Sequence, residues 1–209
     1  MFKKMFPKCV IVLICAVSFF SATHSSYAEA GKSAPASVEA FMEGIRSMKF
    51  PVEDAARHEA LVAQTGAYLD LRAIGEKSLT EHWGTMSAAQ QQSFLDLFSK
   101  LIASIAYPRT NSFLGTQKVV YSEARPIARG VEVASTVKDS EADLDVPVTY
   151  DLYEDNGQWK IYDIFMDGVS MTEDLKTQFN KMIQDGSVDN LLSKMSERLV
   201  KAQKAITEK

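Results

Sequence analysis

The chain has 209 residues, of which 46% are hydrophobic and 24% are charged, and its formal net charge at pH 7 is −4. A chain of this length can bury the core of a single domain. The acidic balance argues against nucleic acid as a partner and against electrostatic binding to an anionic membrane surface.

The first 28 residues have the pattern of a secretory signal peptide. Three lysines precede an apolar run at Val10–Phe20, and cleavage is expected after Ala28 or Ala30. The run is shorter than the ~20 residues of a membrane-spanning helix, which disfavours the alternative of a retained anchor. Removing residues 1–28 takes away both cysteines and leaves 20 basic against 27 acidic residues, a net charge of −7. We therefore expect an exported, periplasmic protein without disulfides.

The segment after the signal peptide is predicted to pass from a flexible leader into helices. Residues 29–37 are small and polar, as expected of a leader. A first helix then ends at Pro51 and carries three apolar residues on one face, Phe41, Ile45 and Met48. Two further helices are expected over residues 55–62 and 68–83.

The clearest helix of the chain begins at Ser87. Ser87 and Gln90 form a capping-box pattern, in which each side chain bonds the backbone N–H of the other. Pro108 is expected to end this helix. Its apolar residues recur every three or four positions: Phe94, Leu97, Phe98, Leu101, Ile102 and Ile105.

After Pro108 the apolar period changes from 3.6 to 2. A strand is expected over residues 118–125, a turn at Arg129-Gly130, and then two alternating strands. Asn156-Gly157 favours a type I′ hairpin turn into a last strand over residues 159–166. Four sequential strands with short turns predict an antiparallel sheet. The alternating faces of its two middle strands are Val131, Val133, Ser135 and Val137, and Leu144, Val146, Val148, Tyr150 and Leu152.

Two amphipathic helices are predicted after the sheet. Ser170 and Glu173 form a second capping box, Gly186 ends the first helix, and Ser187 caps the next. Residues 205–209 are expected to be a disordered tail. The order of helices, sheet and helices predicts an α+β fold with segregated layers, in a single domain over residues 38–204.

The C-terminal third carries a specific sequence resemblance. Residues 159–171 read WKIYDIFMDGVSM and are followed by Gln178-Phe179 and by Asp185-Gly186. This string resembles the signature of the MlaC family, the periplasmic phospholipid-binding proteins of an ABC-type lipid transport system. Positions in the helical half agree: Leu79, Trp83, Gln90 or Gln91, Phe94, Phe98 and Tyr107. Two departures are Thr80, where many relatives have Gly, and Pro108.

The resemblance implies a fold, a cargo and partners. The fold is a curved, NTF2-like antiparallel sheet of four strands covered by a helical layer. Acyl tails of a phospholipid, or of a related lipid such as a hopanoid, are buried between the layers with the headgroup outside. The implied partners are an inner-membrane ABC lipid transporter complex and an outer-membrane lipoprotein–porin complex. The protein is expected to be a monomer with no cofactor other than its cargo lipid.

Burying acyl chains demands an apolar cavity lined by adaptable side chains, since each buried methylene contributes ~0.8 kcal/mol. Methionine and amphipathic aromatic residues suit such a lining. An apolar residue at helical or strand period is more often ordinary core, and that alternative stays open at each position. The predicted lipid-binding residues are Trp83, Phe94, Phe98, Leu101, Tyr150, Leu152, Tyr162, Ile164, Met166 and Met171.

Enzymatic and metal-binding functions have little support in the sequence. Residues 29–209 contain two histidines, His58 and His82, and no metal-ligand motif. Asp163 and Asp167 are possible general bases, but no nucleophile–base pair accompanies them. We expect a non-enzyme. The main alternative to a carrier is a periplasmic adaptor whose interior is filled by its own side chains.

Overall fold

The computed structural model describes residues 33–139, 144–184 and 186–208. The predicted signal peptide and residues 29–32 lie outside this part of the chain. Helix α1 (Ala34–Arg46) begins within the predicted leader, so residues 34–37 are helical and that part of the prediction is wrong. The Ser33 side chain accepts a hydrogen bond from the Ala36 N–H at 3.4 Å and caps the helix, and Ala34 is buried.

Helix α1 ends at Arg46, five residues before the expected stop at Pro51. The side-chain amide of Asn111 donates to the carbonyls of Ile45, Arg46 and Met48 at 2.9, 3.2 and 3.1 Å. These bonds satisfy carbonyls that the helix end leaves free, so the termination is made by a tertiary contact rather than by proline.

The helix expected over residues 68–83 is two helices. After α2 (Ala55–Gly66), helix α3 (Leu71–Leu79) and helix α4 (Glu81–Thr85) are separated by Thr80, whose φ is +46°. Such a conformation is unfavourable for a β-branched residue and breaks the helix. This is the position at which the sequence departs from the MlaC pattern of glycine.

Pro108 does not end the long helix, contrary to the sequence prediction. Helix α5 (Ala88–Leu101) continues through a π-helical turn, η1 (Ile102–Ala106), into α6 (Tyr107–Leu114). The Tyr107 N–H bonds the carbonyl of Ile102, five residues back. The wider turn places Pro108 in the first turn of α6, where a missing N–H costs little. The capping box of Ser87 and Gln90 is present as predicted.

The α+β fold with an antiparallel sheet is confirmed, but the sheet has six strands instead of four. The expected first strand is interrupted, and its two parts both pair with the same neighbour. The sixth strand is a two-residue extension beside the fifth. The strands are β1 (Lys118–Tyr121), β2 (Arg125–Ile127), β3 (Gly130–Asp139), β4 (Leu144–Asp155), β5 (Gln158–Met166) and β6 (Val169–Ser170).

The turn from β4 to β5 is the predicted hairpin, with positive φ at Asn156 and Gly157. After the sheet come α7 (Met171–Gln184) and α8 (Val188–Thr207), the second of which is capped by Ser187. Residues 205–207, predicted as disordered tail, are helical. The last turn is tied down, because the Ile206 carbonyl accepts from the Val52 N–H at 2.7 Å.

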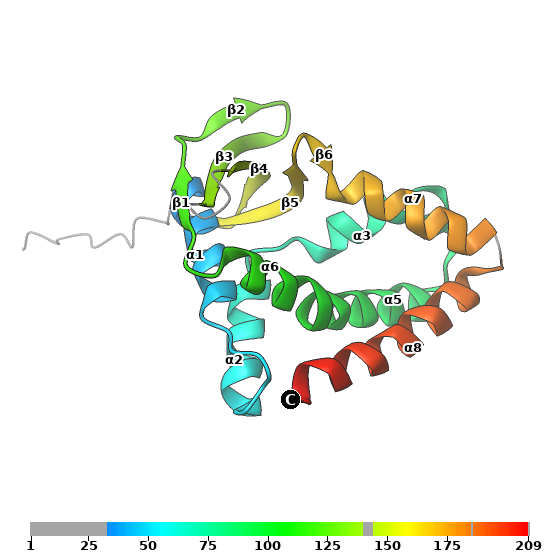
Figure 1. The fold of residues 1–209 in the computed structure, drawn as a ribbon. Helices are drawn as coiled ribbons and strands as arrows, with labels where there is room; N and C mark the ends of the chain where they lie inside the picture. The colour runs from blue at the N-terminus through cyan, green and yellow to red at the C-terminus, as the bar shows by residue number, and fades with distance from the viewer. Residues whose placement is uncertain (1–32, 140–143, 185, 209) are drawn as a thin grey trace, which may run out of the picture.

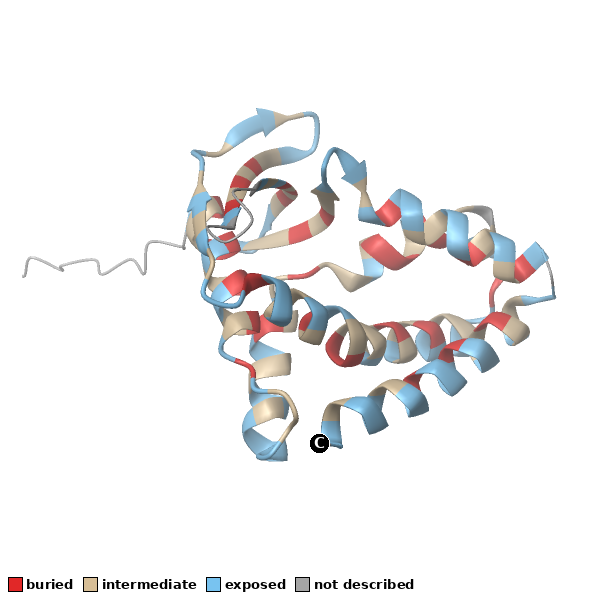
Figure 2. Ribbon diagram, in the orientation of Figure 1, coloured by how far each residue is buried: buried red, intermediate tan, exposed pale blue. Residues whose placement is uncertain are grey.

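The layers are segregated as the sequence predicted. Figure 1 shows the curved sheet at one end of the molecule, with α1 and α6 beside it and α3, α5, α7 and α8 extending to the other end. Figure 2 shows buried residues along the middle strands and along the facing sides of α5 and α8. No helix in the described ranges is long and apolar enough to cross a membrane.

Candidate functional site: an apolar interior in two clusters

The face of the sheet that packs on the helices is apolar because of strand alternation. Val133, Tyr150 and Ile164 are directly opposite one another on β3, β4 and β5. Val133 is fully buried and Tyr150 is 1% exposed. These rows pack against α1 and α6 and form the sheet cluster, whose buried members include Val38, Phe41, Met42, Ile45, Tyr107, Val133, Val137, Val148, Tyr150, Leu152 and Ile161.

A second apolar cluster, the helical cluster, lies among α3, α5, α7 and α8. The rings of Phe94 and Phe98 stack at a centroid distance of 5.5 Å, and Phe179 meets both rings edge-on. Aromatic pairs of this geometry stabilise packing beyond their buried area. The buried members are Ile74, Leu79, Met86, Phe94, Phe98, Phe179, Ile183, Leu191 and Met195.

The two clusters meet at Leu71 and Ile102, which pack against both. Leu71 is the first residue of α3, and Ile102 is the first residue of the π-helical turn. π-helical turns recur at functional sites. The interior therefore has a seam between its sheet side and its helical side, and a backbone irregularity lies on that seam.

The predicted lipid-binding residues are distributed over both clusters and the surface. Tyr150 and Leu152 are buried in the sheet cluster, with Ile164 packed against it. Phe94 and Phe98 are buried in the helical cluster, with Trp83 and Leu101 packed against it. Met166 and Met171 are each 44% exposed. Seven of the ten predicted lipid-binding residues therefore belong to, or pack against, the two clusters that meet at the seam.

Tyr162 lies on the opposite face of the sheet. The pairing of β4 with β5 shifts between Asp151 and Leu152, which are opposite Asp163 and Ile161, so Tyr162 is an extra residue. A bulge of this kind reverses which side chains face the core. The Tyr162 hydroxyl donates to the carbonyl of Arg129 at 2.9 Å, outside the interior.

An exposed apolar corner adjoins the sheet cluster. Met166 is opposite Val169 on β6, and Val169 is 61% exposed. Met166 is also opposite Val148, which is buried on the inner face. The inner face of the sheet therefore continues from the sheet cluster to a corner formed by Met166, Val169 and Met171, where the helices do not cover it. The sequence predicted two of these three residues but not Val169.

A cavity of about 650 Å³ lies elsewhere, between α1, α2 and the β4–β5 turn. None of the ten predicted residues lines it. Its wall on α1 is a stripe of small residues at helical spacing, Ser37, Ala40, Gly44 and Ser47. The sequence prediction missed this stripe because it searched for large apolar residues and assigned Ser37 to the leader.

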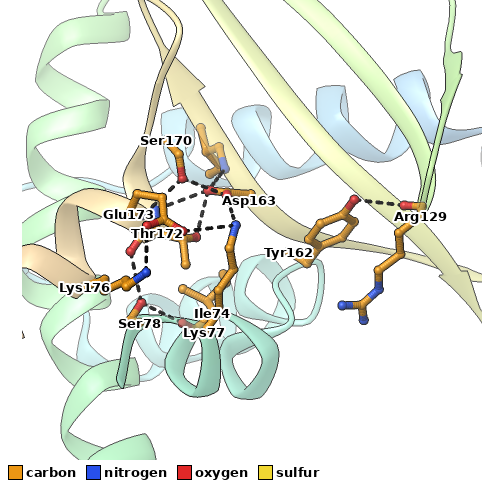
Figure 3. A network of polar contacts seen from close by, with 11 residues as sticks. Ile74, Lys77, Ser78, Arg129, Tyr162, Asp163, Ser170, Thr172, Glu173 and Lys176 are labelled. Atoms are coloured by element: carbon orange, nitrogen blue, oxygen red, sulfur yellow. Dashed lines mark hydrogen bonds and ion pairs between the residues drawn. The ribbon is translucent and has the colours of Figure 1, made fainter. Parts of the chain in front are cut away.

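Asp163 joins the sheet to the helices through a buried polar network (Figure 3). Its carboxylate accepts from the Lys77 ammonium at 3.0 Å and from the Ser170 hydroxyl at 2.8 Å. It also accepts from the Thr172 hydroxyl at 2.7 Å and from the Thr172 N–H at 3.2 Å. Asp163 thereby pins α3 and the first turn of α7 to β5.

Burial alone would raise the pKa of Asp163, which is 1% exposed, but the donors oppose it. Hydrogen bonds from Thr172, Lys77 and Ser170 favour the charged carboxylate, and the net effect lowers the pKa. The Ile164 N–H is a fifth donor, at 2.9 Å, and a carboxylate that these donors hold ionised is a poor general base. The position of Asp163 on β5 fixes the first turn of α7 to the sheet through Thr172.

No group of three or more His, Cys, Asp or Glu side chains among the described residues is arranged to hold a metal ion. Two polar side chains of the sheet cluster are engaged with a neighbouring side chain or with the backbone. The Tyr150 hydroxyl bonds the Met42 sulfur at 3.2 Å, and the Ser135 hydroxyl bonds the Val148 carbonyl at 3.2 Å. These contacts leave a largely apolar inner surface.

The fold and the interior define a class: an α+β protein whose single antiparallel sheet shares an apolar interior with a helical layer. The model of the family described as MlaC protein matches residues 36–197, and the chain belongs to this family, as the sequence resemblance predicted. The match includes all of the helical cluster and nearly all of the sheet cluster.

Two known proteins are similar to the chain. The intermembrane phospholipid transport system binding protein MlaC of Haemophilus influenzae is 26% identical over 136 residues, which are 62% of each protein. The phospholipid-binding protein of Ralstonia solanacearum was solved in complex with a phospholipid. It superposes with a TM-score of 0.67 at 23% identity, over 81% of this chain and 98% of that one. At this identity the likeness shows the fold.

Proposed function

We propose that this protein is a non-enzymatic lipid carrier that binds phospholipid, or a related lipid such as a hopanoid, and moves it between membranes. The observation that carries the proposal is the MlaC family match over residues 36–197. The similar proteins support it, since one is named for phospholipid transport between membranes and the other for phospholipid binding.

The acyl tails are proposed to lie in the seam between the sheet cluster and the helical cluster. Each methylene transferred from water to an apolar site contributes ~0.8 kcal/mol, so a tail of about 16 carbons contributes ~13 kcal/mol. A tail that enters the seam replaces contacts between the clusters with contacts of the same kind. Separation of the clusters around Leu71 and Ile102 would therefore cost far less than exposing them to water.

The exposed corner of Met166, Val169 and Met171 is proposed as the entrance of the seam. It is continuous with the inner face through Val148, and its side chains are apolar and accessible. Methionine adapts its shape to a mobile chain. The headgroup would stay outside in water, where its charge is solvated. This arrangement assigns a role to each predicted lipid-binding residue except Tyr162.

Export to the periplasm follows from the predicted signal peptide and the family. The proposed partners are an inner-membrane ABC lipid transporter complex, which exchanges lipid at one membrane, and an outer-membrane lipoprotein–porin complex, which does so at the other. A soluble carrier between two membranes needs both a donor and an acceptor. We also propose that the protein acts as a monomer.

Lipid analysis of protein purified from bacterial periplasm tests the proposal. Organic extraction and mass spectrometry should recover phospholipid in stoichiometric amount, and the stripped protein should reload from phospholipid vesicles. Ile102→Trp enlarges a side chain on the seam and should reduce loading at least fivefold. Ile105→Trp, in the same π-helical turn but outside both clusters, is the matched control and should load normally. Absence of lipid after both extraction and reloading would overturn the carrier function.

A periplasmic adaptor without cargo is the second candidate. The observation in its favour is that both clusters are filled by the protein's own side chains, while the 650 Å³ cavity lies outside the seam. The two candidates differ in one result. An adaptor should bind no lipid in the reloading experiment, and Ile102→Trp and Ile105→Trp should then behave alike.

A further inference from the structure

The outer face of the sheet, opposite the sheet cluster, contains a recess of about 410 Å³. Its floor is formed by Glu132, Thr149 and Asp151, and apolar walls are supplied by Ile127 and Phe165. Thr149 is opposite Phe165, and Asp151 is opposite both Glu132 and Asp163. The register therefore places these residues on the face opposite Val133, Tyr150 and Ile164. The recess is separate from the proposed lipid seam.

The recess contains one carboxylate, that of Asp151, that forms no direct ion pair with another described residue. Arg125 pairs with Glu132 at 2.7 Å, and Lys77 pairs with Asp163 at 3.0 Å. Asp151 lies between these two carboxylates, and no lysine or arginine among the described residues forms an ion pair with it. Partial burial, followed by the charges of Asp163 and Glu132, raises the pKa of Asp151 and outweighs the opposing charges of Lys77 and Arg125. A cation placed beside Asp151 would relieve this unfavourable arrangement.

The rim of the recess already binds one cationic group on aromatic rings. The guanidinium of Arg129 lies 4.6 Å from the ring centroid of Tyr153 and 4.8 Å from that of Tyr162. Figure 3 shows the side chains of Arg129 and Tyr162. Tyr162 also lines the recess. The walls therefore offer the aromatic and apolar surfaces along which the stem of a basic side chain packs, while the floor offers an unpaired carboxylate.

The chemistry of the occupant follows from these features. Two carboxylates, Glu132 and Asp151, line the floor, and the guanidinium of Arg129 at the rim lies over aromatic rings, so a phosphate group on the floor would meet like charge. A divalent metal is disfavoured because the described residues hold no cluster of three ligands within reach of one ion. A lysine or arginine has both a long apolar stem and a single positive charge. The net charge of −7 expected after export would attract a basic partner as well.

We propose that this recess is a docking site for a basic side chain, lysine or arginine, of a partner protein, with the charged group at Asp151 and the stem against Phe165 and Ile127. The site goes beyond lipid binding, because it lies on the face of the sheet that the seam does not use. It gives the protein a partner contact that is independent of cargo.

A nuclear magnetic resonance titration tests the proposal on the isotope-labelled exported protein. The probe is the peptide acetyl-Gly-Arg-Gly-amide, with acetyl-Gly-Glu-Gly-amide and magnesium chloride as comparison probes at matched ionic strength. The arginine peptide should shift the amide signals of Thr149, Phe165 and Gly168 in a saturable way. Asp151→Asn should weaken this binding at least fivefold. Glu154→Gln removes one charge from the same strand outside the recess and should change it less than twofold.

Three outcomes would overturn the docking site. Binding of the arginine peptide that is equal in wild type and Asp151→Asn would show that Asp151 is not the counter-charge. Shifts scattered over other acidic residues would show non-specific attraction. Equal shifts from magnesium chloride would show a metal-ion site. None of these outcomes depends on lipid, so failure here is distinguishable from failure of the carrier function.

Discussion

The sheet cluster and the helical cluster reach similar burial by different means. The sheet cluster joins residues from α1, α6 and three strands that are far apart in the sequence. The helical cluster is built from helical stripes, and its centre is a group of aromatic rings, Trp83, Phe94, Phe98 and Phe179. The first is stabilised by a hydrogen-bonded ladder as well as by packing, whereas the second depends mainly on side-chain packing, with a few side-chain hydrogen bonds such as that from Gln90 to Asp189.

This difference suggests which side of the seam moves. A paired sheet deforms little, because shifting one strand breaks its ladder. Helices α5, α7 and α8 can move as a group without losing internal hydrogen bonds, since each helix satisfies its own backbone. The connections between the two sides include the Asp163 network, the contacts of Leu71 and Ile102, and the bond between Val52 and Ile206. The start of α3 is also tied to β5, because the Asp70 N–H donates to the Ile161 carbonyl at 2.8 Å. We infer that the helical cluster is the mobile side.

The largest expected effect comes from removing a ring from the centre of the helical cluster. Phe94 is fully buried and contacts Trp83, Phe98 and Phe179, so Phe94→Ala should lower the free energy of unfolding by about 4 kcal/mol. Denaturant titration measures the loss. Hydrogen exchange should accelerate in α5, α7 and α8 before it does in β3 and β4, as expected of a separate cooperative unit.

The control for Phe94→Ala is Phe113→Ala on α6. Phe113 is 40% exposed and should change stability by less than about 1 kcal/mol. If Phe94→Ala accelerated exchange equally in the sheet and in the helices, the two clusters would be a single cooperative unit. The two clusters would then not differ in how readily they open.

Asp163→Asn should have the next largest effect, because it weakens the polar network that joins β5 to α3 and α7. The substitution keeps the size of the side chain but removes the ion pair with Lys77 and places an amide group among five donors. We expect a loss of about 2 kcal/mol in the free energy of unfolding. If the helical side moves to admit lipid, lipid exchange with vesicles should also become faster. Asp167→Asn, in the exposed turn after β5, should change neither quantity.

The pH dependence of stability follows from the lowered pKa of Asp163. An unfolded aspartate titrates near pH ~3.9. Since the folded-state pKa is lower, the stabilisation is complete above the unfolded pKa and is lost as pH falls through the folded-state pKa. The difference in unfolding free energy between wild type and Asp163→Asn should therefore be constant near neutrality and shrink below about pH 4. A difference that instead shrank on raising the pH would contradict this assignment.

The sequence predicted the sheet side better than the seam. Alternation identifies a half-buried strand directly, so the inward positions Val133, Tyr150 and Leu152 were all correct. Tyr162, predicted as a lipid-binding residue because an amphipathic aromatic side chain suits the mouth of a pocket, lies on the other face of the sheet. The bulge makes the inward spacing three, from Ile161 to Ile164. The spacing of three between these two isoleucines was the available signal. A strict alternation of inward and outward side chains cannot accommodate that spacing.

The sequence did not predict the helix boundaries that depend on tertiary contacts. Asn111 ends α1 from 65 residues away, and the π-helical turn lets the chain pass Pro108. Neither effect is encoded in local propensity. The division of the interior into two clusters was also invisible, because helical periodicity shows that Phe98 and Leu101 are buried but not against which partner. The caps, by contrast, are local. The Ser87–Gln90 box is present in full, whereas of the Ser170–Glu173 box only the bond from the Glu173 N–H to the Ser170 hydroxyl is made, because the Glu173 carboxylate pairs with Lys176 instead.

The smallest expected effect concerns one of those caps. The Ser87 hydroxyl accepts from the Gln90 N–H at 3.2 Å, and the Gln90 amide also donates to Asp189 of α8 at 2.8 Å. Ser87→Ala should cost about 1 kcal/mol and increase exchange in the first turn of α5. Ser93→Ala, at an exposed position of the same helix, should cost less than about 0.5 kcal/mol. Because Gln90 links the cap to α8, faster exchange should extend to the start of α8 but not to β4. Exchange confined to α5 would show that the helical cluster does not respond as one unit even to a local change.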